Sequence, residues 1–291
     1  MRKKNAIKNV ADSSMSLGDH LEELRARLML ALIGLFIAMF ASLFFGRKII
    51  AFIEKPYLDV IERQTALENI SPAKNPKENT VVEDANQHST NPEDSKPATI
   101  DPKTRLQSLA PADGFISYIK ICTIAGVIVS SPWIFYQLWM FISAGLYTSE
   151  KKYVKVAAPF SALLFVAGAL FFIFVIAPLT MSFLINFNKS MLGVNSNFTF
   201  RYYISFITKL MLVFGVGFQT PILVFFLNKL GLVSIQALKN SRKFVILAIV
   251  ILAAMATPPD VISQVTLAIP LYVLFELGII ISYLSSKKNR N

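Results

Sequence analysis

Residues 28–45 read LMLALIGLFIAMFASLFF, an apolar run of eighteen residues with no charged side chain. A helix needs ~20 mostly apolar residues to cross a hydrocarbon core of ~30 Å, because lipid cannot hydrogen-bond to unpaired backbone groups. The run therefore predicts a membrane-spanning helix. Arg47 and Lys48 follow it without a small-residue cleavage site, which favours a retained anchor over a signal peptide.

Further apolar stretches follow, and together they predict an all-α integral membrane protein with six transmembrane helices. The predicted spans lie at about residues 28–45, 115–135, 156–176, 204–227, 244–256 and 263–284. The fifth span is short, because its 13 uninterrupted apolar residues reach only ~20 Å at 1.5 Å per residue. We expect a locally thinned bilayer around the fifth and sixth helices, or a re-entrant hairpin formed by both.

Basic residues flank the spans unevenly. Sixteen Lys and Arg residues lie before the first span, after the second, between the fourth and fifth, and after the last. The short loops on the opposite side carry only Lys189, Arg201 and Lys209. Because cytoplasmic loops are enriched in Lys and Arg, both termini are predicted to be cytoplasmic. The net charge of +11 then reflects topology and the anionic lipid face, so we expect no nucleic acid partner.

Residues 62–105 differ in composition from the rest of the chain. They are rich in Pro, Asn, Ser, Thr and charged residues and have few large apolar side chains. Such a segment cannot bury enough apolar surface to fold alone. We expect a disordered external insert in the first loop of an otherwise single membrane domain that covers residues 1–291. Its basic residues do not overturn the topology, because long loops cross membranes largely regardless of charge.

Acidic residues are scarce in the last 178 residues, where they are Glu150, Asp260 and Glu276. Glu150 lies in the predicted cytoplasmic loop after the second span, where an acid would favour the dipole of the following helix. The residues alone leave open whether it also has a functional role. Asp260 follows Pro258 and Pro259, which predicts a turn residue or an N-cap of the last helix.

The segment before the first span reads HLEELRARL at residues 20–28. Helical spacing allows ion pairs among Glu22, Glu23, Arg25 and Arg27. A solvated amphipathic turn at the membrane interface explains this cluster. The two carboxylates beside the spans would nevertheless suit a basic ligand.

Three polar side chains fall within or at the edge of apolar spans, namely Gln219, Gln264 and Glu276. Polar groups are costly in lipid and usually face the bundle interior or a wet cavity, so a functional role is the default hypothesis. These residues also motivate an alternative function, transport of a small solute by a secondary transporter.

No pattern in the sequence predicts catalysis. The histidines are His20 and His88, and Cys122 is the single cysteine, so no cluster has metal-ligand spacing. The sequence also lacks a G-x-S-x-G nucleophile motif and a phosphate-binding glycine loop. We therefore expect no enzyme activity, no cofactor and no metal.

Several separated motifs carry a family resemblance. They are HLEELR (20–25), SPWIFYQLWMFI (131–142), EKKY (150–153), FGVGFQTP (214–221), TPPDVISQ (257–264), LAIPL (267–271) and FELG (275–278). In this combination the chain resembles the TatC family, the multispanning receptor subunit of the twin-arginine translocase. The resemblance covers nearly the whole chain apart from the insert.

The resemblance implies a six-helix receptor with both termini cytoplasmic, in the inner membrane of a bacterium, which makes the insert periplasmic. Such a receptor binds the twin-arginine signal peptides of folded proteins. It recruits single-span TatA/TatB-type subunits, forms an oligomer within the receptor complex, and takes part in export driven by the proton-motive force. No covalent chemistry is involved.

By motif position the resemblance assigns recognition of the arginine pair to Glu23 and Glu150, with Arg25 and His20 in the same site. An arginine side chain can form two parallel charge-assisted hydrogen bonds with a carboxylate, which lysine cannot reproduce. The resemblance also matches Pro56 to a proline of the external loop, where it would determine loop shape.

The chain departs from the family pattern at Gln219, a position that some relatives fill with glutamate. A neutral amide cannot titrate, so proton movement at this site is disfavoured. An intramembrane hydrogen bond or a contact with a partner helix remains compatible with glutamine. The long insert and Ala144, where many relatives have proline, are further departures.

Overall fold

The computed structural model describes residues 17–70, 106, 108–147, 150–192, 199–257 and 261–288. Every regular element in these residues is helical, which confirms the predicted all-α class. The elements are α2 (Leu17–Ile70), α3 (Asp113–Ala144), α4 (Lys151–Phe171), the π-helix η2 (Phe172–Ile176), α5 (Ala177–Leu192), α6 (Phe200–Gly217), α7 (Thr220–Lys229), α8 (Ile235–Asn240), α9 (Arg242–Ala256) and α10 (Val261–Lys288).

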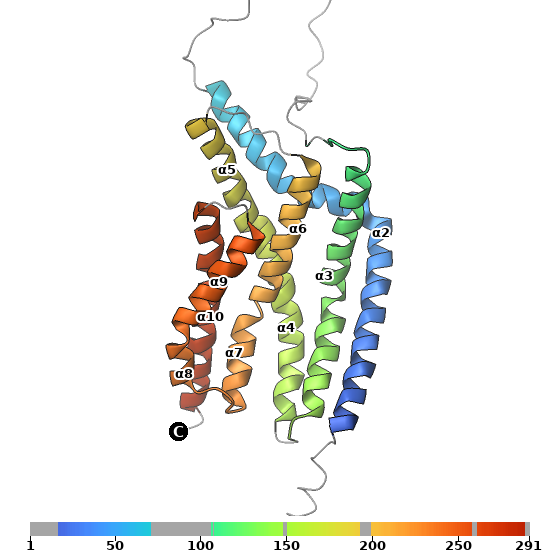
Figure 1. The fold of residues 1–291 in the computed structure, drawn as a ribbon, viewed down its shortest axis with the longest axis vertical. Helices are drawn as coiled ribbons and strands as arrows, with labels where there is room; N and C mark the ends of the chain where they lie inside the picture. The colour runs from blue at the N-terminus through green and yellow to red at the C-terminus, as the bar shows by residue number, and fades with distance from the viewer. Residues whose placement is uncertain are drawn as a thin grey trace, which may run out of the picture.

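The long helices stand side by side in one bundle (Figure 1). The beginning of α2 and the end of α10 lie at the same end of the bundle, together with the α3–α4 and α7–α8 connections. We call this the terminal end and the opposite one the far end. The far end holds the end of α2, the beginning of α3, the end of α5 and the beginning of α6.

Five helical segments of the described chain are long and apolar enough to cross a membrane. They are Gly18–Arg63, Asp113–Ala144, Lys151–Met191, Phe200–Lys229 and Val261–Ser286. The remaining predicted span corresponds to α9, which has 15 residues and a length of about 22 Å. It is shorter than the hydrocarbon core of ~30 Å, so the count of six spans stays a prediction.

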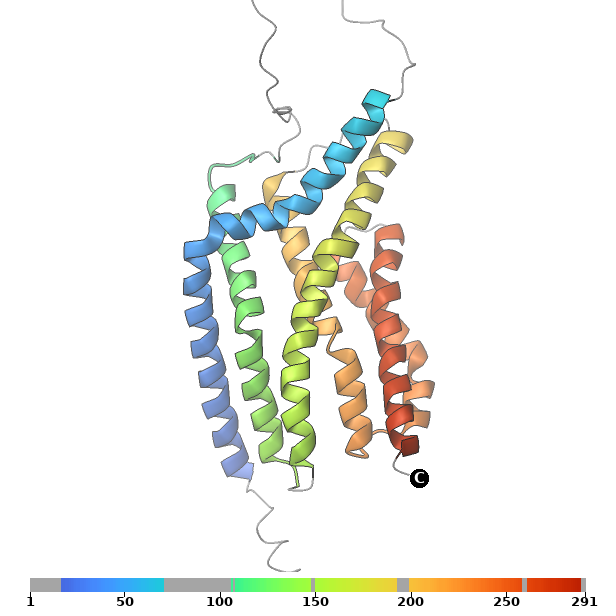
Figure 2. The same cartoon turned by 180° about the vertical axis from the view of Figure 1, so that it is seen from behind.

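Helix α2 is much longer than its predicted span. It continues to Ile70, so residues 62–70, assigned above to the insert, are helical; the rest of the insert lies outside the described residues. The second half of α2 turns and crosses over the neighbouring helices (Figure 2). Its buried side chains Ile53, Tyr57 and Val60 recur at helical spacing, which explains why the helix continues.

Pro56 lies inside α2 and not in a loop, which corrects the role expected for it. It is buried in the half of α2 that crosses the bundle. A proline inside a helix removes one backbone hydrogen bond and bends the helix. Pro56 is therefore placed to bend α2. The helix continues past it because the apolar side chains on either side of it are buried against neighbouring helices.

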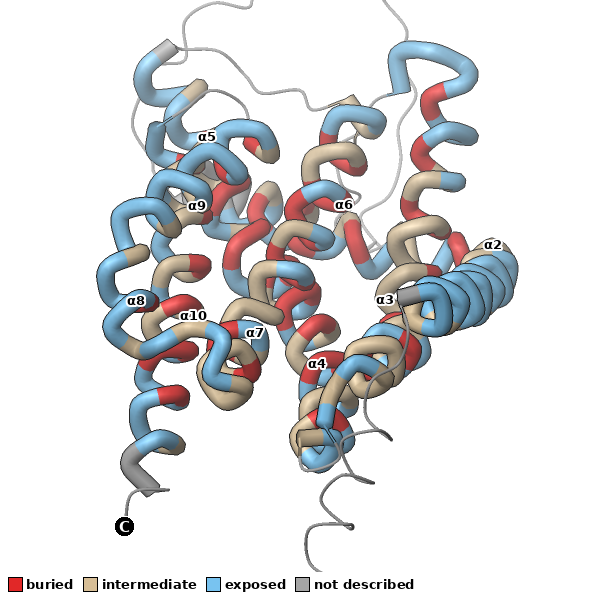
Figure 3. The backbone as a smooth tube through the Cα atoms, turned by 60° about the horizontal axis from the view of Figure 1, so that its bottom comes forward, coloured by how far each residue is buried: buried red, intermediate tan, exposed pale blue. Residues whose placement is uncertain are grey.

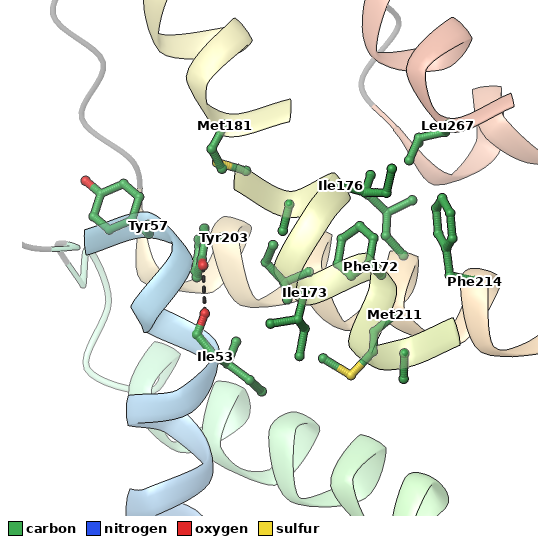
Figure 4. Close-up of a cluster of buried hydrophobic side chains, with 14 of the residues drawn as sticks. Ile53, Tyr57, Phe172, Ile173, Ile176, Met181, Tyr203, Met211, Phe214 and Leu267 are labelled. Atoms are coloured by element: carbon green, nitrogen blue, oxygen red, sulfur yellow. Dashed lines mark hydrogen bonds between the residues drawn. The ribbon is translucent and has the colours of Figure 1, made fainter. Parts of the chain in front are cut away.

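The main core joins α2 to η2, α5 and α6 (Figure 4). Phe172 and Phe214 are fully buried, and their ring centroids are 5.5 Å apart. Tyr203 of α6 points to α2, where its hydroxyl donates a buried hydrogen bond of 2.8 Å to the carbonyl oxygen of Ile53. This bond ties the crossing half of α2 to the central helix α6.

The first half of α2 is peripheral. Of the residues in its most apolar stretch, only 6% are buried. Figure 3 shows this helix exposed on most sides. It packs on α3 through small residues: a side-chain carbon added to Gly126 would lie 2.8 Å from the Cα atom of Met39. Close backbone approach of this kind is typical of helices that associate in lipid.

Replacing Tyr203 with phenylalanine should remove the buried hydrogen bond from α6 to the Ile53 carbonyl oxygen of α2. We expect a loss of about 1 kcal/mol in stability, which corresponds to a fall of ~2–4 °C in Tm. Thermal unfolding of the full chain in mild detergent measures this change. Tyr202→Phe is the matched control, because Tyr202 is 73% exposed and should leave Tm unchanged; an equal effect of both changes would contradict the role of the hydrogen bond.

Candidate signal-peptide site and intramembrane polar residues

The candidate site residues of the HLEELR and EKKY motifs lie at the terminal end of the bundle, where α2 and α4 begin. His20, in the first turns of α2, stacks on Phe141 near the end of α3, with ring centroids 4.6 Å apart. A side-chain carbon added to Gly145, in the α3–α4 connection, would lie 3.4 Å from His20 Cε1. The structure therefore brings the start of α2 against the segment that leads to Glu150.

Glu23 belongs to a small polar network between α2 and α3. Its Oε1 atom accepts a hydrogen bond of 2.7 Å from Arg27 Nε, one helical turn along α2. Arg27 Nη1 also donates to Gln137 Oε1 of α3 at 3.2 Å. Gln137 is almost completely buried, so Arg27 holds Glu23 in place and is itself held by α3. Arg25 is exposed on the same helix.

Glu150 directly precedes the first residue of α4, as expected for a helix-start acid. Its Oε2 atom accepts a long hydrogen bond of 3.4 Å from the backbone nitrogen of Tyr147. In the described part of the chain, no Lys or Arg forms an ion pair with it. A half-buried carboxylate beside Lys151 and Lys152 thus keeps capacity for an additional cationic donor.

Gln219 lies in the break between α6 and α7 and is the N-cap residue of α7. Its Nε2 atom donates to the carbonyl oxygen of Ser161 at 2.9 Å, and Ser161 Oγ accepts a buried bond of 2.8 Å from Trp139 Nε1. A polar network therefore connects α3, α4 and the α6–α7 break. The backbone at the break forms its own hydrogen bonds, from Gln219 N to the Val216 carbonyl oxygen and from Leu223 N to the Gln219 carbonyl oxygen, so the side-chain network serves to hold the break against α4.

Gln264 and Glu276 are both bound within the pair formed by α9 and α10. Gln264 Nε2 donates to the carbonyl oxygen of Val250 at 2.9 Å. Glu276 Oε2 pairs with Arg242 at 2.8 Å, and Glu276 Oε1 accepts from the Tyr272 hydroxyl at 2.8 Å. The three intramembrane polar residues thus contact different partners and do not gather into one site, which gives no support to a small-solute transporter.

The comparisons with known proteins address the family directly. The family model for the Sec-independent protein translocase protein (TatC) matches residues 19–270, which is most of the chain. The chain belongs to the TatC family. It is therefore related to a component of the Sec-independent protein translocase, which agrees with the expectation that it is not an enzyme.

Individual relatives agree over most of their length. A TatC protein of Helicobacter pylori strain J99 is 39% identical over 65% of this chain and 76% of its own length. A TatC protein of Aquifex aeolicus is 31% identical over 95% of this chain and 98% of its own. A crystal structure of a twin-arginine translocase receptor TatC is 30% identical, covers 92% of this chain and 99% of its own, and superimposes with a TM-score of 0.71.

Helical spacing predicted ion pairs in the segment before the first span, and the Arg27–Glu23 pair is one of them. Two residues of the polar networks were missed by the sequence reasoning, Gln137 and Ser161. Gln137 is an isolated amide in an apolar stretch, which is the signal that could have identified it. Pro258, Pro259 and Asp260 lie outside the described residues. In the part of the chain that is described, no group of three or more His, Cys, Asp or Glu side chains could hold a metal ion.

Replacing Gln137 with leucine should loosen the start of α2. Arg27 would lose its acceptor on α3, at a cost of about 1.5–3 kcal/mol for one hydrogen bond to a charged group. We expect faster backbone hydrogen exchange in residues 18–27, measured by mass spectrometry on the full chain. Gln137→Glu is the matched control, because it keeps the acceptor oxygen for Arg27; equally fast exchange in both variants would contradict this role of Gln137.

Proposed function

We propose that this TatC-family chain is the receptor that binds twin-arginine signal peptides of folded precursor proteins, through Glu23 and Glu150 at the terminal end. The observation that carries the proposal is the presence of two carboxylates at the same end of the bundle. Glu150 has no ion-pair partner in the described chain, and Glu23 lies on α2, whose start packs against the segment that leads to Glu150. The stacking of His20 on Phe141 at 4.6 Å supports this arrangement. The similarity to a crystallised twin-arginine translocase receptor supports the function.

Each carboxylate retains an oxygen for a ligand. Within the described chain, Glu23 uses Oε1 for Arg27 and Glu150 uses Oε2 for the Tyr147 backbone. An arginine side chain could bind each remaining oxygen with a charge-assisted hydrogen bond of about 1.5–3 kcal/mol. Arg25, which is exposed nearby, would disfavour binding of further cations and so help to place the two arginines.

The proposed topology puts the terminal end in the cytoplasm of a bacterium and the far end outside the inner membrane. The common location of the start of α2 and the end of α10 supports an even number of crossings (Figure 1). We infer that α9 is the sixth span, in a bilayer thinned around it. This topology brings Glu23 and Glu150 to the face from which precursors arrive.

Partner recruitment is assigned to the intramembrane residues with unused bonding capacity. In the described chain, the side chains of Gln219 and Gln264 form hydrogen bonds only through Nε2, so their side-chain Oε1 atoms remain for a single-span TatA/TatB-type helix. An apolar cavity of about 350 Å³ is lined by Val216, Gly217 and Thr220, which are close to Gln219 in the chain. Both oxygens of Glu276 are already bound, so we assign Glu276 to holding α9 against α10.

Replacing Glu150 with glutamine removes the charge and keeps the shape. We expect binding of a twin-arginine precursor to weaken about 10- to 100-fold, as for the loss of one charge-assisted hydrogen bond. Equilibrium binding of the precursor to the full chain in membranes measures this change. Glu62→Gln is the matched control, because Glu62 is an exposed carboxylate near the other end of α2; equal binding by both variants would reject Glu150 as a ligand.

The site itself is tested by photocrosslinking in native membranes. Photoreactive residues in place of Leu24 and Tyr147, both exposed, should crosslink a twin-arginine precursor and lose this product with a twin-lysine precursor. A probe at Leu232, exposed beside α7, should give little product. Crosslinks that are equal for both precursors would contradict arginine recognition at this site.

A further inference from the structure

A cavity of about 280 Å³ opens on the outer face of the bundle between α5, α6 and the end of α9. Its apolar lining includes Met181, Phe206 and Met255, and its polar lining includes Ser205, Thr257 and Lys209. Met255 is 76% exposed, so the cavity faces the surroundings of the protein and not the core. It is separate from the candidate site at the terminal end.

Two lysine side chains approach this cavity from different helices. Lys209 lines it and is exposed, and Lys120 of α3 donates a hydrogen bond of 2.9 Å to Ser205 Oγ. Among the described residues, no carboxylate pairs with either lysine. Asp113, the acid at the start of α3, is buried and already paired with Arg201 at 3.1 Å. The two ammonium groups therefore lack a described counter-ion.

The position of Lys209 makes this positive charge costly. Lys209 lies about 13 Å along α6 from its first residue, at the level where the last residues of α9 line the same cavity. A charged group at membrane depth is unfavourable unless it is paired or reaches polar surroundings. The carboxyl end of α9 supplies only about half a negative charge, so most of the charge of the two lysines is uncompensated.

We propose that this cavity binds an anionic phospholipid of the far-end leaflet, with the phosphodiester at Lys209 and Ser205 and an acyl chain along the apolar lining. The mixed lining matches a molecule with one negative charge joined to a hydrocarbon chain. The cavity is too small for a helix. The short α9 lets lipid headgroups sink to the level of Lys209, so the bound lipid also stabilises the thinned bilayer around α9.

The experiment compares two photoactivatable lipids, phosphatidylglycerol and phosphatidylcholine, in vesicles that contain the full chain. Peptides labelled by each lipid are identified by mass spectrometry. We expect residues 202–209 and 255–257 to be labelled about fivefold more by phosphatidylglycerol, as for one lysine at an anionic headgroup. Lys209→Met should reduce this labelling to the phosphatidylcholine level, and Lys209→Arg should retain it.

Two further variants separate the cavity from general surface charge. Lys189→Met removes an exposed lysine of α5 that does not line the cavity, and it should not change labelling. Ala256→Phe fills the cavity without changing charge, and it should reduce labelling by both lipids. Equal labelling by the two lipids, an unchanged preference in Lys209→Met, or competition by millimolar inorganic phosphate would overturn the proposal.

Discussion

Lipid offers no hydrogen-bond partner to the peptide backbone, and the helical architecture of this protein follows from that constraint. Long apolar runs must be helical, so the described chain has helices and connections only. Where a helix is interrupted, the protein itself must supply polar partners. The break between α6 and α7 is bridged by Gln219, which bonds the Ser161 carbonyl oxygen. The bend of α2 is tied to α6 by Tyr203, which bonds the Ile53 carbonyl oxygen.

Packing within the bundle is uneven, and this has consequences for function. The centre, where η2 and α6 meet, is densely packed around Phe172 and Phe214. The first half of α2 contacts little besides α3 and is mostly exposed. Glu23 lies on this peripheral helix, so its position depends on a few contacts with α3, of which the Arg27–Gln137 hydrogen bond is one. The proposed arginine site would therefore be positioned by α3 on one side and open on the other.

The charged side chains fall into three groups with different surroundings. Carboxylates without a full set of partners lie at the terminal end, where they suit cationic ligands. The Arg242–Glu276 pair joins α9 to α10 and so fixes a helix of only 15 residues to a longer neighbour. Lys120 and Lys209 remain without a described counter-ion near the far end. Their charge is explained if a lipid phosphate replaces the missing carboxylate.

The sequence by itself determined the helical class, the approximate spans and the family, because apolar length and short motifs are local properties that no tertiary contact can change. Glu23 and Glu150 stand out as acids in the sequence, but their role in arginine recognition comes from the motif resemblance and stays a proposal. Tertiary structure alone decided that α2 continues through Pro56 to Ile70, because the reason is a buried face that packs on distant helices. It likewise decided that Gln219 bonds Ser161 and that Glu276 bonds Arg242. These partners lie 58 and 34 residues apart in the chain, and packing brings them together. A local sequence pattern cannot predict such a contact.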